Sequence, residues 1–252
     1  MLLYRFESLK YLDGLLHAVT KKSQGAPYHF SLALHTGEEQ KKIIENREKI
    51  ALLLSSKNDL HFVVAKQTHS DHIKVLTRTE TKGWNTMEDA IDDCDALITA
   101  EKGVILTILT ADCVPILLYD PVKEVVAAVH AGWKGTQAQI VAKTVIKMKE
   151  QFDCHEDNIV AAVGPSIGKC CYEVGEEVAK HFFDIPHAFI QKGEKYMLDL
   201  PYINKYQLLD AGLKETNIEM SNVCTACEVE DYFSYRKEQG CSGRFMSMIG
   251  MD

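Results

Sequence analysis

The chain has 252 residues, of which 46% are hydrophobic and 25% are charged, a composition typical of soluble globular proteins with a substantial core. Its net charge of −8 argues against broad binding to nucleic acids or anionic membranes, because both require a basic face. No run approaches the roughly 20 apolar residues of a membrane span, and charged residues interrupt the apolar N-terminal stretch. We therefore expect a cytoplasmic protein without a signal peptide.

The hydrophobic patterns predict, in chain order, a helix over 38–56, strands over 61–66, 95–99, 104–109, 114–120 and 125–130, a helix over about 136–152 and a strand over 158–163. A helix near 175–184, a strand in YMLDL, a helix beginning at Pro201 and the closing segment DYFSYR…GRFMSMIGM follow. The strands cluster, and helices lie between groups rather than after every strand. This order favours an α+β fold with a mixed sheet over a doubly wound α/β fold, and we expect a single domain over residues 1–252.

A predicted hairpin brings a cysteine close to a histidine. In TADCVPILLYDPVKEVVAAVHAGWKG, two apolar runs flank DPVK, and Asp-Pro commonly opens a turn. A four-residue loop over 120–123 would pair Tyr119 with Glu124 and place Cys113 opposite His130. Directly paired residues project to the same face with Cβ atoms roughly 4.5–5.5 Å apart. One metal ion could therefore bind both side chains.

The third expected ligand is His69, which follows the predicted strand over 61–66 in a loop at a sheet end. Two histidines and one cysteine leave one position of a tetrahedral zinc ion open for water or substrate, which is the pattern of a catalytic site. His72 could instead supply a fourth ligand and close the site, as a structural zinc site requires.

Five segments resemble one known family: KQTHSDH, LTADCVPILLYD, AVHAGWKGT, AVGPSIGKCCYEVG and FSYR…GR. Their order and spacing, from about residue 28 to the C-terminus, are similar to those of the multicopper polyphenol oxidoreductase (laccase) family. This family is also called purine nucleoside phosphorylase YfiH-like and is related to the human laccase-domain-containing protein. The resemblance implies a large mixed β-sheet flanked by helices and zinc ligands at His69, Cys113 and His130.

The same resemblance implies an activity and its substrates. It implies phosphorolysis of adenosine, inosine, guanosine and methylthioadenosine, and deamination of adenosine, so that a purine nucleoside and phosphate are the expected partners. Family members usually carry an asparagine where this chain has Ala33, which bears on the transfer of a specific activity. The oligomeric state and the preferred nucleoside do not follow from the sequence.

Several further residues are predicted to take part in the reaction. For phosphate, GPSIGK offers backbone N–H groups and the Ser166 hydroxyl. The basic residues closest to the motifs are Arg47, Lys134 and Arg236, for which the alternative is a solvated surface charge. Asp112 should point away from Cys113 along the strand, where it could orient a metal-bound histidine, take a proton or cap the strand end.

The eight cysteines, at positions 94, 113, 154, 170, 171, 224, 227 and 241, lack the spacing of a disulfide framework. We expect buried thiols, metal ligands or catalytic groups instead. Cys170 and Cys171 are interpreted as buried thiols, one of which could line the site. Cys224 and Cys227 form a C-x-x-C without a second pair, and we assign them no zinc.

Other functions use the same residues. A multicopper cluster needs many histidines, usually in H-x-H pairs, and the ten histidines of this chain form none. Copper in place of zinc could give weak polyphenol oxidation. Cys113 as nucleophile with His130 as base would make a cysteine hydrolase. The zinc site could also edit peptidoglycan precursors by hydrolysis, or stabilise a binding module.

Overall fold

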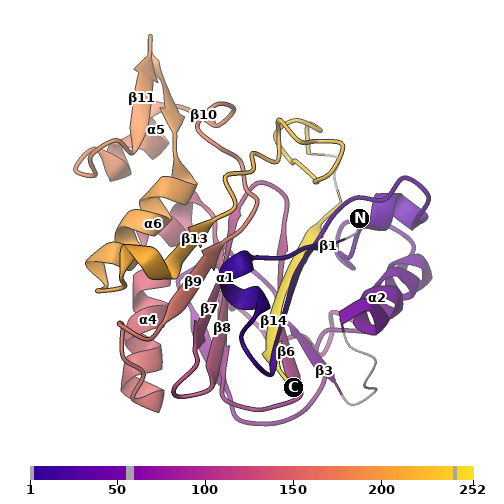
Figure 1. Cartoon of the computed structure of the whole chain (residues 1–252). Coiled ribbons are helices and arrows are strands. Elements are labelled where there is room, and N and C mark those ends of the chain that lie inside the picture. The colour runs from indigo at the N-terminus through magenta and orange to yellow at the C-terminus, as the bar shows by residue number, and fades with distance from the viewer. Residues whose placement is uncertain (1–2, 55–59, 241–242) are drawn as a thin grey trace.

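Two mixed β-sheets stack face to face in the computed structural model, which describes residues 3–54, 60–240 and 243–252 (Figure 1). The five-stranded sheet has the order β1 (Leu3–Tyr4), β2 (Leu15–Thr20), β14 (Phe245–Met251), β6 (Val104–Thr110) and β3 (His61–Val64). The six-stranded sheet has the order β13 (Ile218–Met220), β9 (Val160–Val163), β7 (Val114–Asp120), β8 (Val125–Ala131), β5 (Ala96–Thr99) and β4 (Ile73–Leu76). A small third sheet has the order β10 (Glu173–Val174), β12 (Lys195–Leu198) and β11 (Phe189–Lys192).

Apolar side chains fill three layers. One cluster lies between the two large sheets and includes Leu106 of β6 and Leu117 of β7. On the outer face of the six-stranded sheet, residues such as Ile116 pack with α4 (Ile140–Phe152) and α6 (Leu200–Asp210). On the outer face of the five-stranded sheet, residues such as Ile105 pack near α2 (Gln40–Leu54). Strands β6, β7, β8 and β14 are buried throughout, and this explains their nearly continuous apolar sequences.

The predicted α+β class and the mixed sheet flanked by helices are confirmed, but the strands divide between two large sheets. The predicted helix over 136–152 is two helices, α3 (Trp133–Gln137) and α4, because Gln139 between them is left-handed with φ 60°. The helix predicted near 175–184 is α5 (Glu176–Ala179) followed by a 3₁₀ turn, Lys180–Phe182. The helix predicted over 38–56 is α2, and residues 55–56 lie outside the described residues.

Shorter elements complete the described chain: α1 (Glu7–Lys10) and the 3₁₀ turns Pro27–Phe30 and Glu215–Asn217.

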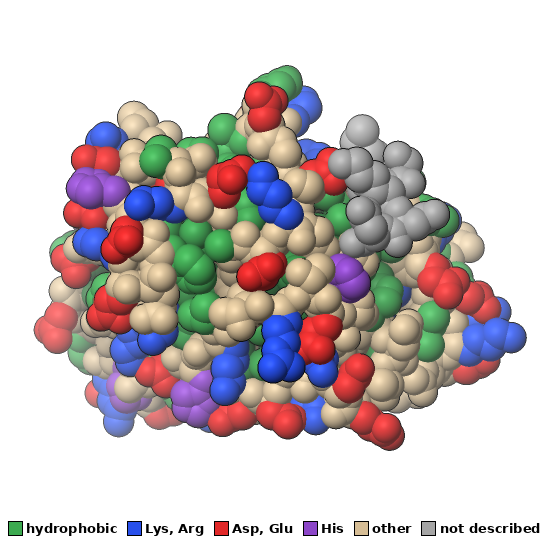
Figure 2. Space-filling model, turned by 90° about the horizontal axis from the view of Figure 1, so that it is seen from below, with side chains coloured by type: hydrophobic (Ala, Val, Ile, Leu, Met, Phe, Trp, Pro, Cys, Tyr) green, Lys and Arg blue, Asp and Glu red, His purple; other side chains and the backbone are tan. Residues whose placement is uncertain are grey.

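Among the helices of the described residues, none combines the length and the apolar character needed to cross a membrane. On the face drawn in Figure 2, acidic and basic side chains alternate, and the described side chains of that face form no broad basic patch. This agrees with the net charge of −8.

The β7–β8 hairpin differs from its predicted register. Asp120 pairs with Val125 and Pro115 with His130, so the loop covers 121–124 rather than 120–123, and the prediction that Cys113 lies directly opposite His130 is wrong. The Asp120 carboxylate accepts hydrogen bonds from the N–H groups of Val122 and Lys123, at 2.9 and 3.1 Å, and this turn keeps Asp120 at the end of the strand. The shift is an even number of residues, so the faces of the strand are unchanged.

Two connections pass between the large sheets at the same end of the stack. Strands β3 and β6 are parallel neighbours in the five-stranded sheet, so the segments that follow them start at one edge. The first continues to β4 and the second to β7, both in the six-stranded sheet. These two connections carry His69 and Cys113.

Candidate metal centre

His69, Cys113 and His130 converge from three segments. One nitrogen of each ring and the Cys113 sulfur all lie within 4.8 Å of one another, and Cys113 Sγ is 3.9 Å from His69 Nε2. In a tetrahedral zinc site with bonds of about 2.3 Å to sulfur and 2.0 Å to nitrogen, the sulfur and nitrogen atoms would be about 3.5 Å apart. The separation therefore fits a shared ion, and a thiolate with two imidazoles is a donor set that zinc or copper accepts.

Close backbone packing permits this convergence. Gly132, at the start of α3, lies so near the ligands that a Cβ atom there would be 2.9 Å from His69 Cδ2 and 3.2 Å from Cys113 Sγ. His69 itself is left-handed, with φ 60°. The glycine of the HAGW motif thus leaves room for two of the three ligands.

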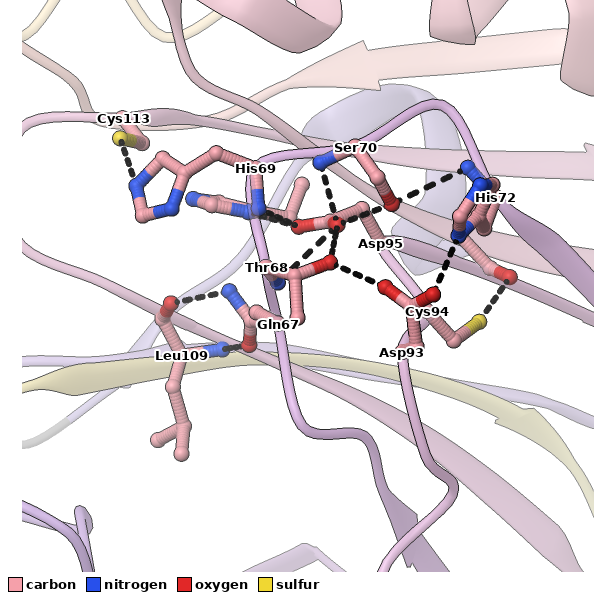
Figure 3. A network of polar contacts seen from close by, with 12 residues as sticks. Gln67, Thr68, His69, Ser70, His72, Asp93, Cys94, Asp95, Leu109 and Cys113 are labelled. Carbon is pink, nitrogen blue, oxygen red and sulfur yellow. Dashed lines mark hydrogen bonds and ion pairs between the residues drawn. The ribbon is translucent and has the colours of Figure 1, made fainter.

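A buried aspartate holds the ring of one histidine and the backbone of the other (Figure 3). Asp95 is fully buried at the start of β5, and its Oδ1 lies 2.7 Å from His130 Nδ1. It also accepts hydrogen bonds from the backbone N–H groups of Thr68, His69 and Ser70, and from the Ser70 hydroxyl. Since the Nδ1–H of His130 is held by this carboxylate, its Nε2 is left to face the other two ligands, which is how carboxylate–histidine pairs orient metal ligands. Orienting a histidine was one of three roles considered for Asp112, and in the structure it is Asp95 that contacts the His130 ring.

The three groups also form an ionised network without a metal. Burial raises the pKa of the Cys113 thiol, but His130 and then His69 outweigh this and lower it to about 6. Burial lowers the pKa of His130, but the Cys113 thiolate and Asp95 raise it to about 9. Burial would likewise raise the pKa of Asp95, yet hydrogen bonds from His130 and Ser70 hold it well below its usual range. Cys113 is thus poised as a thiolate, the form that binds metal.

His72 does not join the ligands. Its Nδ1 lies 2.9 Å from Asp93 Oδ2, its side chain is 55% exposed, and Figure 3 shows it on the side of the network away from Cys113. Among the described residues, the candidate group therefore offers three ligand atoms and no fourth.

A cavity of about 770 Å³ opens onto the ligands, a size common for small-molecule sites. Its wall contains His69, Cys113 and His130, the basic side chains His35, Lys66, Arg236 and Arg244, and the aromatic rings of Tyr172 and Tyr235. The Arg236 guanidinium lies 5.2 Å from the centre of the Tyr172 ring. Cationic and aromatic groups thus share one pocket with the metal ligands.

Two of the predicted non-ligand residues lie in this wall. Asp112 precedes β7 with φ 87°, so it does not alternate along the strand as predicted. Its two oxygens accept hydrogen bonds from the Thr225 hydroxyl at 2.7 Å and the Arg236 N–H at 2.6 Å. Asp112 therefore anchors the segment that carries Arg236.

The other three predicted residues lie elsewhere. Arg47 is fully buried, and its guanidinium donates to the carbonyl groups of Leu32, Gly83 and Trp84, so it cannot reach phosphate. The Lys134 side chain is exposed near the Trp133 ring, outside the cavity wall. Ser166 is buried and lines a second, smaller cavity. The phosphate-binding role predicted for Arg47 is wrong.

The sequence predictions did not include Asp95 or Arg244. Asp95 is the first residue of the predicted strand DALIT. An aspartate at the start of an apolar strand could have indicated a partner for a predicted metal-binding histidine. Arg244 is the arginine of the GR motif near the C-terminus, and the sequence alone indicates no role for it.

Comparisons with known proteins find similar chains and a similar fold. The family model described as multi-copper polyphenol oxidoreductase laccase matches residues 16–252. Similar proteins include a purine nucleoside phosphorylase of Bacteroides thetaiotaomicron, 34% identical over 97% of this chain and 94% of the relative, and purine nucleoside phosphorylase YlmD of Bacillus subtilis, 38% identical over 86% and 80%. Adenosine deaminase RL5 of an unknown prokaryotic organism is 34% identical over 87% and 86%. The crystal structure of the hypothetical protein YfiH of Bacillus licheniformis superposes with a TM-score of 0.90 at 34% identity, over 96% of this chain and 95% of that one.

Proposed function

Since this chain belongs to the multi-copper polyphenol oxidoreductase laccase family, with relatives named as purine nucleoside phosphorylases and an adenosine deaminase, we propose that it is a zinc-dependent enzyme of purine nucleosides. Phosphorolysis of adenosine, inosine, guanosine and methylthioadenosine is the main proposed activity, and adenosine deamination is the second. One observation carries the proposal: three metal-ligand side chains lie in the wall of a nucleoside-sized cavity that two arginines also line.

The two reactions make different demands on the pocket. In phosphorolysis the N-glycosidic bond breaks, a phosphate oxygen bonds to C1′ of the ribose, and the base leaves with the bonding electrons and takes up a proton. In deamination water attacks C6 of the purine and ammonia leaves. A zinc ion bound by His69, Cys113 and His130 would supply Lewis acidity next to the substrate, which serves either reaction.

The residues of the chain would bind and orient the substrates. Tyr172 and Tyr235 offer flat apolar surface for a purine base. Arg236 and Arg244 offer guanidinium groups, which match the geometry of phosphate oxygens. With Lys134 and Ser166 outside this cavity wall, the arginines are the better phosphate ligands. Asp112 acts in this scheme by positioning Arg236, and a direct role for it in proton transfer would require release of one of its two hydrogen bonds.

The test uses zinc-loaded protein with adenosine, inosine and methylthioadenosine, each with and without phosphate. Free base together with ribose-1-phosphate that depends on phosphate establishes phosphorolysis, and inosine formed from adenosine establishes deamination. His69→Ala should abolish turnover, whereas His72→Ala, a histidine of the same loop outside the ligand group, should retain it. Equal activity of the two variants, or no turnover of any nucleoside by the wild type, would contradict the proposal.

The thiolate of Cys113 beside His130 also favours a cysteine hydrolase as a second candidate. Such an enzyme would keep its activity after chelation of zinc, whereas the proposed enzyme would lose it and regain it with added zinc. Release of an amino acid from a peptidoglycan precursor, with every nucleoside inert, would point instead to an editing hydrolase that uses the same metal site.

A further inference from the structure

Four cysteines converge at a place distinct from the three-ligand centre. The sulfur atoms of Cys170, Cys171, Cys224 and Cys227 all lie within 4.8 Å of one another. Cys227 Sγ is 3.6 Å from Cys170 Sγ and 3.5 Å from Cys171 Sγ. All four are free thiols, and these separations are far longer than the roughly 2.05 Å of a disulfide bond.

The geometry points to a second metal site, and we propose that these four cysteines bind one zinc ion as a closed tetrathiolate. In a tetrahedral site with Zn–S bonds of about 2.3 Å, neighbouring sulfur atoms are about 3.8 Å apart. The separations of 3.5 and 3.6 Å and the 4.8 Å limit on all pairs bracket this value. On metal binding each thiol releases its proton, and the four Zn–S bonds replace four S–H bonds.

The backbone around the four cysteines has features that are common in zinc sites. Cys224 and Cys227 lie in a tight turn in which the N–H groups of Cys227 and Glu228 both donate to the Cys224 carbonyl, at 3.1 and 2.9 Å. This is the C-x-x-C spacing common in zinc sites. The Gly168 N–H lies 3.3 Å from Cys224 Sγ, and such hydrogen bonds stabilise the negative charge of a bound thiolate.

The exposure of the cluster argues against ordinary core thiols. Free cysteine is among the most buried residue types, as Cys94 and Cys154 are here. Cys170 and Cys227, by contrast, are exposed, and Cys171 and Cys224 are half-buried. The prediction that Cys170 and Cys171 are buried thiols is therefore wrong for Cys170. The fold places these two residues beside Cys224 and Cys227, so the C-x-x-C has a second cysteine pair next to it.

The position of the cluster suggests what the second ion does. It would join two segments 53 to 57 residues apart that a short parallel bridge, Ser166 to Cys224, already holds together. Tyr172, directly after Cys171, lines the catalytic cavity. Thr225, inside the C-x-x-C, donates to Asp112 next to the ligand Cys113. A tetrathiolate zinc would thus fix two walls of the neighbouring pocket without contacting substrate.

The test counts metal in the full chain, purified under reducing conditions and measured by elemental analysis. We expect two zinc ions per wild-type chain, one in His69→Ala, one in Cys227→Ser and none when both substitutions are combined. Cys154→Ala, which removes a cysteine outside the cluster, is the matched control and should keep two. Cobalt bound to the His69→Ala protein should give the intense visible absorption of a four-thiolate site. This variant keeps all four cysteines, so the measurement tests the cluster even if Cys227→Ser does not fold.

Four outcomes would overturn the inference, the fourth by changing the identity of the ion. The first is His69→Ala protein that is folded but free of metal, and the second is equal zinc in Cys227→Ser and the wild type. The third is a disulfide between Cys227 and Cys170 or Cys171 in freshly isolated protein. Iron bound in place of zinc would overturn the assignment of the ion. Because His69→Ala removes the catalytic ligand and leaves the cluster, this experiment is independent of the proposed nucleoside chemistry.

Discussion

At the scale of single residues, the candidate metal centre depends on residues outside the proposed ligand group. Asp95 is fully buried and gathers the backbone of residues 68–70 and the ring of His130 around one carboxylate. Gly132 has no side chain, and a Cβ atom at this position would crowd His69 and Cys113. Both residues can be tested without altering a ligand.

Replacing Asp95 with asparagine should weaken zinc binding by about 10–100-fold, because loss of the carboxylate releases the His130 ring from its fixed orientation. The affinity can be measured by competition with a coloured chelator. Asp93→Asn is the matched control, as its exposed carboxylate contacts His72 and Thr68 but no metal ligand. Equal weakening in both variants would show that Asp95 has no special role.

Replacing Gly132 with alanine should reduce zinc affinity through a steric clash with His69 and Cys113. The φ of Gly132 is −73°, which alanine adopts readily, so backbone strain does not contribute. Gly25→Ala, where a Cβ meets nothing within 4 Å, controls for the general effect of removing a glycine. Unchanged zinc affinity in Gly132→Ala would mean that the ligands can move apart at no cost.

At the scale of elements, the β7–β8 hairpin pairs His130 with Pro115, two residues after Cys113, and its turn sets this register. The sequence pattern correctly predicts both strands, because their apolar runs are continuous and the turn between them is polar. It does not predict the pairing, since that depends on which N–H groups the Asp120 side chain binds. The register differs from the prediction by an even number of residues, so each side chain still lies on the predicted face of its strand, because side chains alternate with a period of two.

Replacing Asp120 with alanine should lower the free energy of unfolding by about 1–3 kcal/mol, because the buried carboxylate accepts hydrogen bonds from Val122, Lys123 and His155. Urea unfolding measures the change. Lys123→Ala, an exposed substitution in the same turn, should change stability by less than about 0.5 kcal/mol. A similar effect of both substitutions would contradict the importance of the Asp120 turn.

At the scale of the whole molecule, the stacking of the two large sheets creates the candidate three-ligand centre, whereas the four cysteines meet beyond the ends of two neighbouring strands of one sheet. Connections that cross from one sheet to the other bring His69 and Cys113 together, and the loops after β9 and β13 bring the four cysteines together. The same stacking buries polar groups that link distant parts of the chain. His17 of β2 is 1% exposed and accepts a hydrogen bond from the Phe6 N–H at 2.9 Å.

His17 should make the stability of the protein sensitive to acid. Burial, and then the charge of Arg5, lowers its pKa from 6.5 to about 4, so the folded chain keeps this ring neutral. Below pH 6.5 the unfolded chain takes up a proton that the folded chain does not, and stability falls as the pH drops towards 4, by about 3 kcal/mol from this residue. His17→Gln, which keeps an acceptor for Phe6, should flatten the curve over this range in urea unfolding. A slope equal to that of the wild type would contradict the assignment.

The sequence by itself determined the α+β class, most strand positions and the identity of the three side chains that converge at the candidate metal centre. Apolar periodicity, turn chemistry and ligand type are local properties, so they can be read without knowing the fold. Only the tertiary structure decided that Asp95 rather than Asp112 holds His130, that Arg47 is buried against carbonyl groups, and that Cys170 and Cys171 complete the C-x-x-C. These outcomes depend on which distant segments meet in the folded chain, within one sheet or between the two, and those contacts are set by burial across the whole chain rather than by any one segment.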